Sequence, residues 1–182
     1  MNTPRWMILW IVISLDLAVL FYWRFRREHR FDGIIRAAAT EYGLPPALVK
    51  AVVWRESRFD PTVRGSAGEI GLMQVMEDAA LEWATAERIS PFKHELLFDP
   101  ATNTQAGAYY LAKLLKRYTN TDNPLPYALA DYNAGRGNVL GWLKGAAATN
   151  SAAFVATIGF PSTRAYIQSV TNRYEQYRKG LH

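Results

Sequence analysis

The chain has 182 residues, 49% hydrophobic and 13% aromatic, enough for one folded domain with a sizeable core and too apolar for a disordered chain. The absence of cysteine excludes a disulfide framework and thiolate zinc sites, but it leaves the compartment open. The formal net charge is +5, yet residues 1–31 hold five of the 21 basic and two of the 16 acidic residues. The remainder is nearly neutral and shows no basic helix face with interleaved aromatic residues, so we expect no nucleic-acid partner.

An almost unbroken apolar run starts at Trp6 and ends at Trp23, interrupted by Ser14 and Asp16. Its length, its flanking arginines and the aromatic residues near both ends are typical of a membrane-spanning helix. A cleaved signal peptide is the alternative, but the run is long, and RFRREHR follows it where a cleavage site with small residues would stand. Asp16 would need a partner helix or a proton inside a bilayer, which hints at self-association. We therefore expect an uncleaved N-terminal membrane anchor with a basic juxtamembrane segment over residues 1–31.

The charges around this run conflict with a domain outside the cytoplasm. One arginine precedes the run and four follow it: Arg5, and then Arg24, Arg26, Arg27 and Arg30. The positive-inside rule would place the following domain in the cytoplasm. A second interpretation is that the four arginines hold the domain against anionic lipid headgroups.

From residue 32 onward the pattern predicts helices. They are expected at residues 32–42, 44–57, 77–87 and 100–118, from Pro124 or Pro126 to Gly135, and at residues 138–144 and 163–177. Gly43 and Gly135 are expected to end helices, and Asp99 and Thr163 to cap the start of others. The stretch ISPFKHELLFDP is expected to be a loop. No run has the turn chemistry of a β-hairpin, so the predicted fold class is mainly α, with at most a small ribbon near residues 69–75.

Glu56 stands out on the helix that follows Pro45. Leu48, Val49, Val52 and Val53 recur at helical spacing, and Glu56 continues the same face. Burial and the negative end of a helix that stops nearby would both raise the pKa of its carboxyl. That is the environment of a general acid. The spacing is equally compatible with a glutamate at a frayed helix end that turns to water.

Four motifs occur in a fixed order across residues 32–177: ESRFDP, GSAGEIGLMQ, ALADYNAG and PSTRAYIQSV. Together they resemble the lytic transglycosylases of the soluble-transglycosylase (SLT) type, whose catalytic domain is similar to goose-type lysozyme. The resemblance implies a lysozyme-like catalytic domain over residues 32–182. It also implies an enzyme without metal or cofactor that acts on the glycan strands of peptidoglycan. The three histidines, which are scattered along the chain, form no ligand cluster either.

The resemblance also implies roles for individual residues. Glu56 would be the single acid and base. It would protonate the β-1,4 bridging oxygen after N-acetylmuramic acid and then take a proton from that sugar's C6 hydroxyl, which closes a 1,6-anhydro ring. Residues that would contact the substrate or the glutamate are Ser57, Met73, Gln74, Tyr132, Asn133 and Tyr166.

Each of these residues also has an ordinary structural interpretation. Ser57 could be a polar residue at a helix end, Met73 and Gln74 could be turn and core residues, and Tyr166 could belong to the core stripe of the last helix. The motif ADYNAG departs from the usual AYNAG by placing Asp131 before the tyrosine. Asp131 is expected to lie on a solvated face or to partner a cap, about 100° away from Tyr132 around the helix.

The predicted function is therefore that of a membrane-anchored lytic transglycosylase whose catalytic domain lies on the outer side of the cytoplasmic membrane, with protein partners unknown. One alternative is hydrolysis of the same bond, as in goose-type lysozyme, which needs a second carboxylate to hold a water. The weak candidates for that carboxylate are Asp60, Glu69 and Asp131. The other alternative is an inactive wall-binding scaffold that keeps the cleft.

Overall fold

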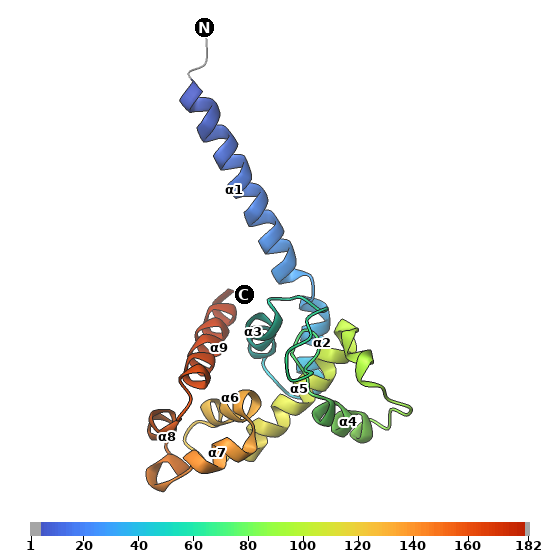
Figure 1. Cartoon of the computed structure of the whole chain (residues 1–182), viewed down its shortest axis with the longest axis vertical. Coiled ribbons are helices and arrows are strands. Elements are labelled where there is room, and N and C mark those ends of the chain that lie inside the picture. Colours follow the sequence, from blue (N-terminus) through green and yellow to red (C-terminus); the bar gives the residue numbers. More distant parts are fainter. Residues whose placement is uncertain (1–4, 181–182) are drawn as a thin grey trace.

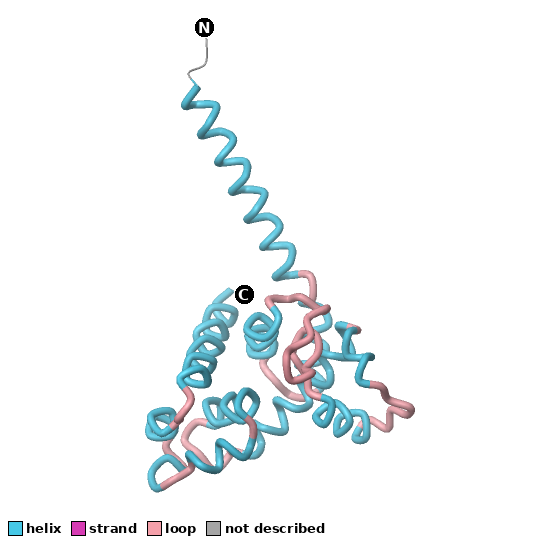
Figure 2. The backbone as a smooth tube through the Cα atoms, viewed as in Figure 1, coloured by secondary structure: helices cyan, strands magenta, loops and turns pink. Residues whose placement is uncertain are grey.

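The computed structural model describes residues 5–180, which are almost entirely helical (Figures 1 and 2). The α-helices are α1 (Arg5–His29), α2 (Asp32–Glu41), α3 (Pro46–Ser57), α4 (Glu77–Ala86), α5 (Pro100–Arg117), α6 (Pro124–Ala134), α7 (Arg136–Trp142), α8 (Ser151–Thr157) and α9 (Pro161–Gly180). Two short 3₁₀ helices are η1 (His94–Phe98) and η2 (Gly145–Ala148). The longest non-helical segment of the folded part joins α3 to α4 and is drawn in pink in Figure 2.

Helix α1 projects away from the other helices, which pack together at its C-terminal end (Figure 1). Most of its large apolar side chains are exposed, including Trp6, Trp10, Leu15, Leu20 and Phe21. Among the described residues, no helix combines the length and the hydrophobicity that crossing a membrane requires. The predicted membrane-spanning helix is therefore not confirmed.

Helix α3 lies in the middle of the core, where it packs against α2 and α9. Every residue from Ala47 to Val53 is buried, because neighbouring helices cover more than one face of α3. Helix α5 packs against α2, α4 and α6, and α6 also packs against α9. The fold therefore brings α3, α6 and α9 together, although they are far apart in the sequence.

Several predicted helices and caps are confirmed. The boundaries of α2, α4, α5 and α6 agree with the predicted ones to within two residues. The Asp99 carboxylate accepts a hydrogen bond of 2.8 Å from the backbone N–H of Thr102 at the start of α5, and Pro100 occupies the first helical position. Gly135, at φ +81°, ends α6.

Other predictions are wrong or incomplete. Thr163 does not cap the last helix, because α9 already begins at Pro161, and the Thr163 side chain is buried in its first turn. Part of the expected loop before Asp99 forms η1, and the pattern missed η2 and α8, which are too short to show a helical period. The expected ribbon is reduced to two isolated antiparallel bridges, which join Ile70 to Arg64 and to Val75; residues 5–180 contain no longer strand.

Candidate active site

Glu56 is the penultimate residue of α3, and the helix ends just after it. The Arg58 backbone is left-handed (φ +53°), and its N–H donates to the Trp54 carbonyl, which stops the helix within two residues of Glu56. The predicted apolar face is buried: Leu48, Val49, Val52 and Val53. The carboxyl of Glu56 therefore stands at the edge of the core, at the negative end of the α3 dipole.

Burial raises the pKa of Glu56 from 4.5 to about 7. The negative charge of Glu69 acts in the same direction, more weakly, whereas a hydrogen bond from Tyr166 and the positive charge of Arg55 oppose the shift. Near neutral pH both the protonated and the ionised forms of Glu56 are accessible. A single carboxyl can then donate a proton in one step and accept one in the next.

Tyr166, on α9, lies against this carboxyl. Its hydroxyl donates a hydrogen bond to Glu56 Oε1, and its side chain is 1% exposed. The Arg55 guanidinium lies 5.2 Å from the centre of the Tyr166 ring. Burial, followed by the nearby charge of Glu56, raises the pKa of Tyr166 well above 10, so its hydroxyl remains a donor at neutral pH. Packing of α9 on α3 thus fixes the orientation of the Glu56 carboxyl.

Tyr132, on α6, approaches the same region from another side. Its hydroxyl donates a 2.8 Å hydrogen bond to the main-chain oxygen of Met73. Burial is the main cause that raises the pKa of Tyr132 well above 10, and the charge of Glu56 is the next. Tyr132 therefore lies near Glu56, as the resemblance implies, but its described hydrogen bond goes to the main chain of the loop between α3 and α4.

Gln74 occupies a strained position in that loop. Its φ is +48°, a left-handed conformation that is uncommon for a residue other than glycine, asparagine or aspartate. Its Nε2 donates to the carbonyls of Val63 (3.1 Å) and Gly71 (2.9 Å), which uses both donors of the amide. These bonds fix the side chain and leave its Oε1 as the group that can accept a hydrogen bond from a ligand.

The sequence analysis missed Asn103, which holds this loop in place. Asn103 is fully buried on α5. Its Nδ2 donates to the carbonyls of Ile70 (2.7 Å) and Leu97 (2.9 Å), and its Oδ1 accepts from the N–H of Met73 (2.8 Å). A detectable signal was available: Asn103 is a polar residue on the same helical stripe as Ala106 and Tyr110.

Ser57 and Met73 lie deeper than the resemblance implies. The Ser57 hydroxyl is buried, with the carbonyls of Leu72 (2.8 Å) and Val53 (3.2 Å) as its partners, so its described bonds join α3 to the loop and not to Glu56. The Met73 side chain is fully buried against α5, where a Cβ at Gly107 would lie 2.5 Å from the Met73 sulfur. Contact of either side chain with a sugar stays a prediction.

A groove with a volume of about 430 Å³ runs alongside these residues. Three of the predicted site residues line it: Gln74, Tyr132 and Asn133. The Asn133 Oδ1 accepts a 2.9 Å hydrogen bond from the Thr163 hydroxyl, which leaves its amide nitrogen at the groove. Glu56 is not among the residues that line this groove, which shares Gln74, Tyr132 and Asn133 with the predicted site.

Each of the three candidate second carboxylates has partners of its own, although the charge of Glu69 also acts on Glu56. Asp60 accepts hydrogen bonds from the N–H and hydroxyl of Thr62, which hold its pKa below its usual value. Glu69 accepts a 3.0 Å hydrogen bond from the N–H of Ala67 and folds over its own turn. The prediction that Asp131 faces solvent is wrong: it is 1% exposed, because α5 packs against that face of α6. Across residues 5–180, no group of three or more histidines and carboxylates is arranged to hold a metal.

Comparison with known proteins identifies the family of this chain. The family model described as "Transglycosylase SLT domain" matches residues 33–155 of this chain, which is more than half of it. The chain belongs to the SLT domain family. The predicted mainly α, SLT-type fold is thereby confirmed.

One curated relative of this SLT domain is the membrane-bound lytic murein transglycosylase C of Shigella sonnei (strain Ss046). It is 35% identical over 121 residues, which are 63% of this chain and 34% of the relative. The chain therefore spans about a third of the length of this relative.

Solved structures of lytic transglycosylases share the fold. The 70-kDa soluble enzyme SLT70 from Escherichia coli superposes with a TM-score of 0.74 at 29% identity, over 83% of this chain and 24% of that one. An inactive glutamate-to-glutamine mutant of Slt from Pseudomonas aeruginosa superposes with a TM-score of 0.74 at 30% identity, over 82% of this chain and 24% of that one. A 70-kDa soluble lytic transglycosylase in complex with bulgecin A superposes with a TM-score of 0.75 at 28% identity, over 86% of this chain and 25% of that one. In each case the SLT domain matches a quarter of a larger protein.

Proposed function

We propose that this SLT domain is a peptidoglycan lytic transglycosylase with Glu56 as its only acid and base. The observation that carries the proposal is the carboxyl of Glu56, which burial brings to a pKa of about 7 and which Tyr166 orients. The names of the relatives, all lytic transglycosylases, support the substrate class. The inactivity of the glutamate-to-glutamine mutant of the Pseudomonas enzyme supports an essential glutamate.

The proposed reaction consumes no water. Protonated Glu56 gives its proton to the β-1,4 bridging oxygen as the bond from that oxygen to C1 of N-acetylmuramic acid breaks. The ionised carboxylate then takes the proton of that sugar's C6 hydroxyl, whose oxygen bonds to C1. Glu56 returns to its starting state, and the strand ends in a 1,6-anhydro sugar. Because this hydroxyl is tethered to the reacting carbon, its effective concentration can far exceed that of water.

The engagement of the other carboxylates supports this route over hydrolysis. Inverting hydrolysis typically needs a second carboxylate about 6.5–9.5 Å from the first, placed to activate a water. Asp60 bonds within its own turn, and Asp131 is buried in an ion pair. Glu69, whose charge acts on Glu56, bonds an N–H of its own turn through Oε2. The C6 hydroxyl is therefore the nucleophile that we propose.

The test is mass spectrometry of fragments that the full chain releases from purified peptidoglycan sacculi. We expect most fragments to be lighter by one water than the products of a hydrolase. A majority of reducing ends would assign the chain to the lysozyme reaction. The Glu56→Gln variant is the control, and its cutting rate should fall by several orders of magnitude, because the only proton donor is lost. Failure of the wild-type chain to cut would instead favour the inactive scaffold.

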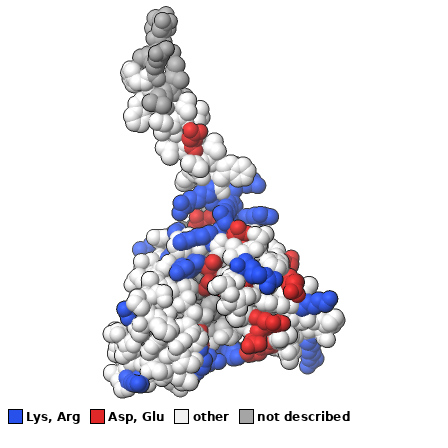
Figure 3. All heavy atoms as spheres, viewed as in Figure 1, with Lys and Arg blue, Asp and Glu red and all other residues white. Residues whose placement is uncertain are grey.

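We also propose that α1 holds the SLT domain at the outer face of the cytoplasmic membrane, with residues 6–23 in the bilayer. The exposed apolar side chains of α1 and the name "membrane-bound" of the curated relative support attachment. Figure 3 shows Lys and Arg side chains gathered where α1 meets the domain. The arginines at this end of α1 are Arg24, Arg26, Arg27 and Arg30.

Contacts between this end of α1 and the domain would hold the domain at a fixed position relative to the membrane. Tyr177 donates a hydrogen bond to Glu28, Arg173 lies 3.8 Å from the same carboxylate, and Arg27 lies 3.6 Å from Asp60. The arginine segment lines a cavity of about 1360 Å³ between α1 and the end of α3. The four arginines at this end of α1 would meet anionic headgroups. Each would contribute about 1 kcal/mol to the free energy of membrane binding.

A further inference from the structure

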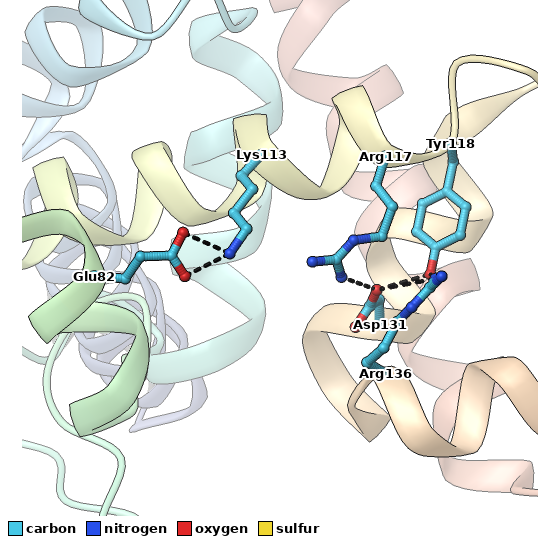
Figure 4. Close-up of polar contacts among 6 residues, drawn as sticks. All are labelled: Glu82, Lys113, Arg117, Tyr118, Asp131 and Arg136. Carbon is cyan, nitrogen blue, oxygen red and sulfur yellow. Dashed lines mark hydrogen bonds and ion pairs between the residues drawn. The ribbon is translucent and has the colours of Figure 1, made fainter. Parts of the chain in front are cut away.

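The groove beside Gln74 and Tyr132 continues into a charged end for which the proposed reaction has no use. Its lining there comes from α4, α5, α6 and α7 and includes Asp78, Glu82, Lys113, Arg117, Asp131 and Arg136. Figure 4 shows two separate ionic groups in this region. In one, Lys113 bonds both carboxylate oxygens of Glu82, which makes a neutral pair.

The second group is organised around the buried carboxylate of Asp131. Its Oδ2 accepts hydrogen bonds from Arg117 (2.6 Å) and from the hydroxyl of Tyr118 (2.7 Å), and Arg136 lies 4.0 Å away. Arg136 also donates to the Tyr118 oxygen at 2.7 Å. Burial, followed by the hydrogen bond to Asp131, raises the pKa of Tyr118 to about 12, so its hydroxyl remains a donor. Asp131 therefore positions Arg117 directly and Arg136 through Tyr118 at the groove.

Two guanidinium groups share this one carboxylate, so this corner carries one unbalanced positive charge. Asp78, on α4, is the further carboxylate that lines the groove, and it makes no ion pair with either arginine. The side chains of Arg117 and Arg136 are 28% and 43% exposed. Each uses a single nitrogen, Nη1, in its bonds to described residues, which leaves further N–H donors available at the groove.

We propose that Arg117 and Arg136 bind a carboxylate of the glycan strand, and that Asp131 is the residue that positions them. This inference rests on the proposed function. A guanidinium suits a carboxylate because it offers parallel N–H donors in a fixed plane, and two of them add positive charge. Two parts of a peptidoglycan strand carry that group: the peptide stem, and the lactyl ether of N-acetylmuramic acid where the stem has been removed. The groove would thus set which strands the enzyme accepts.

Arg136→Gln is the informative variant. Arg136 is the more exposed arginine and its closest partner is the neutral Tyr118 hydroxyl, so its loss should be tolerated by the fold. Loss of Arg117 would leave the buried Asp131 carboxylate without its direct ion-pair partner and would endanger folding. Arg36→Gln, at an exposed position of α2 away from the groove, is the matched control.

Binding is measured in the full chain with Glu56→Gln, so that the strands are not cut. The two ligands are strands that carry peptide stems and strands from which an amidase has removed the stems, which exposes the lactyl carboxylate. We expect Arg136→Gln to raise the Kd for one of the two kinds of strand by about tenfold, which corresponds to the loss of one charge-assisted hydrogen bond. Arg136→Lys, which keeps the charge without the planar fork, should restore part of the affinity.

The strand type that is affected identifies the source of the carboxylate. Weakening confined to stem-bearing strands assigns the stem, and weakening confined to stripped strands assigns the lactyl group. Equal effects on both strands, or no difference from Arg36→Gln, would overturn the proposal. The readout needs no cutting, so it stays separate from the product analysis that tests the proposed function. Thermal unfolding of each variant confirms that it is folded.

Discussion

At the scale of the residue, Glu56 combines two demands that oppose each other. A general acid that works near neutral pH needs a carboxyl that holds its proton, and burial at the end of α3 provides it. The same burial disfavours the ionised form that the second step requires. The hydrogen bond from Tyr166 and the charge of Arg55 moderate the shift, which keeps both forms accessible.

This arrangement predicts a pH-dependent stability difference. The carboxyl of Glu56 titrates near 4.5 when unfolded and near 7 when folded, so it favours the folded state fully below pH 4.5 and loses that contribution as the pH rises through 7. Glutamine never ionises. We therefore expect Glu56→Gln to lie within about 1 kcal/mol of the wild type at pH 5 and to be more stable at pH 8, on the order of 3 kcal/mol for a shift of this size.

Urea unfolding of both proteins at the two pH values measures this difference. Glu95→Gln, at an exposed position of η1, is the matched control for the replacement of a glutamate by glutamine. Equal stability of Glu56→Gln and wild type at pH 8 would mean that the carboxyl is hydrated in the folded protein and is not a general acid of the proposed kind.

At the scale of the element, the site depends on a loop that has almost no regular structure of its own. The segment between α3 and α4 contributes Met73 and Gln74, and its shape depends on hydrogen bonds to other elements. Asn103 supplies two of them from α5, to Ile70 and Met73, and Tyr132 supplies one from α6. A strained Gln74 backbone persists because these partners over-determine the loop.

Asn103→Ala should therefore affect both stability and cutting. It leaves the buried N–H of Met73 and two buried carbonyls with fewer partners, so we expect a loss of about 2–4 kcal/mol in the free energy of unfolding. Cutting should fall at least tenfold in the molecules that remain folded, because Gln74 and the partner of Tyr132 shift. Urea unfolding and the cutting rate on sacculi at a temperature where the variant is folded are the two measurements.

Thr104→Val is the matched control for this change. Thr104 is the next residue of α5 and is equally buried, but its hydroxyl bonds the Pro100 carbonyl within its own helix. Replacement of Thr104 by valine should change the free energy of unfolding and the cutting rate little. If Asn103→Ala cuts at the wild-type rate when folded, the loop does not position the site.

At the scale of the whole molecule, the proposed location can be tested with cysteines, because the chain has none of its own. We expect Lys144→Cys, at an exposed position between α7 and η2, to react with a membrane-impermeant maleimide in intact spheroplasts. Asn2→Cys, on the other side of the proposed span, should react only after lysis. This outcome would go against the arginine bias that follows residue 23.

The reverse labelling pattern would refute both the location and access to peptidoglycan. Extraction of membranes with carbonate distinguishes a helix in the bilayer from one on its surface. We expect the full chain to stay with the membrane, because residues 6–23 bury their apolar side chains there. Release by carbonate would mean that α1 only lies on the surface.

The sequence by itself determined the helical class, most helix boundaries of the folded part and the apolar face that Glu56 continues. These depend on local physics: apolar spacing at 3.6 residues, proline and aspartate at helix starts, glycine at helix ends, and a glutamate that continues an apolar face. The ordered motifs predicted that Glu56, Gln74, Tyr132 and Tyr166 share one site. Their contacts with substrate remain predictions.

Tertiary structure alone decided the rest. The direction in which Asp131 points depends on which helix covers that side of α6, and α5 turns an expected surface residue into a buried ion-pair partner. The role of Asn103 depends on a loop 30 residues earlier in the chain, and Thr163 bonds α6 because of how α9 packs. No local pattern encodes such long-range partners, because each depends on the docking of elements that only the complete fold brings together.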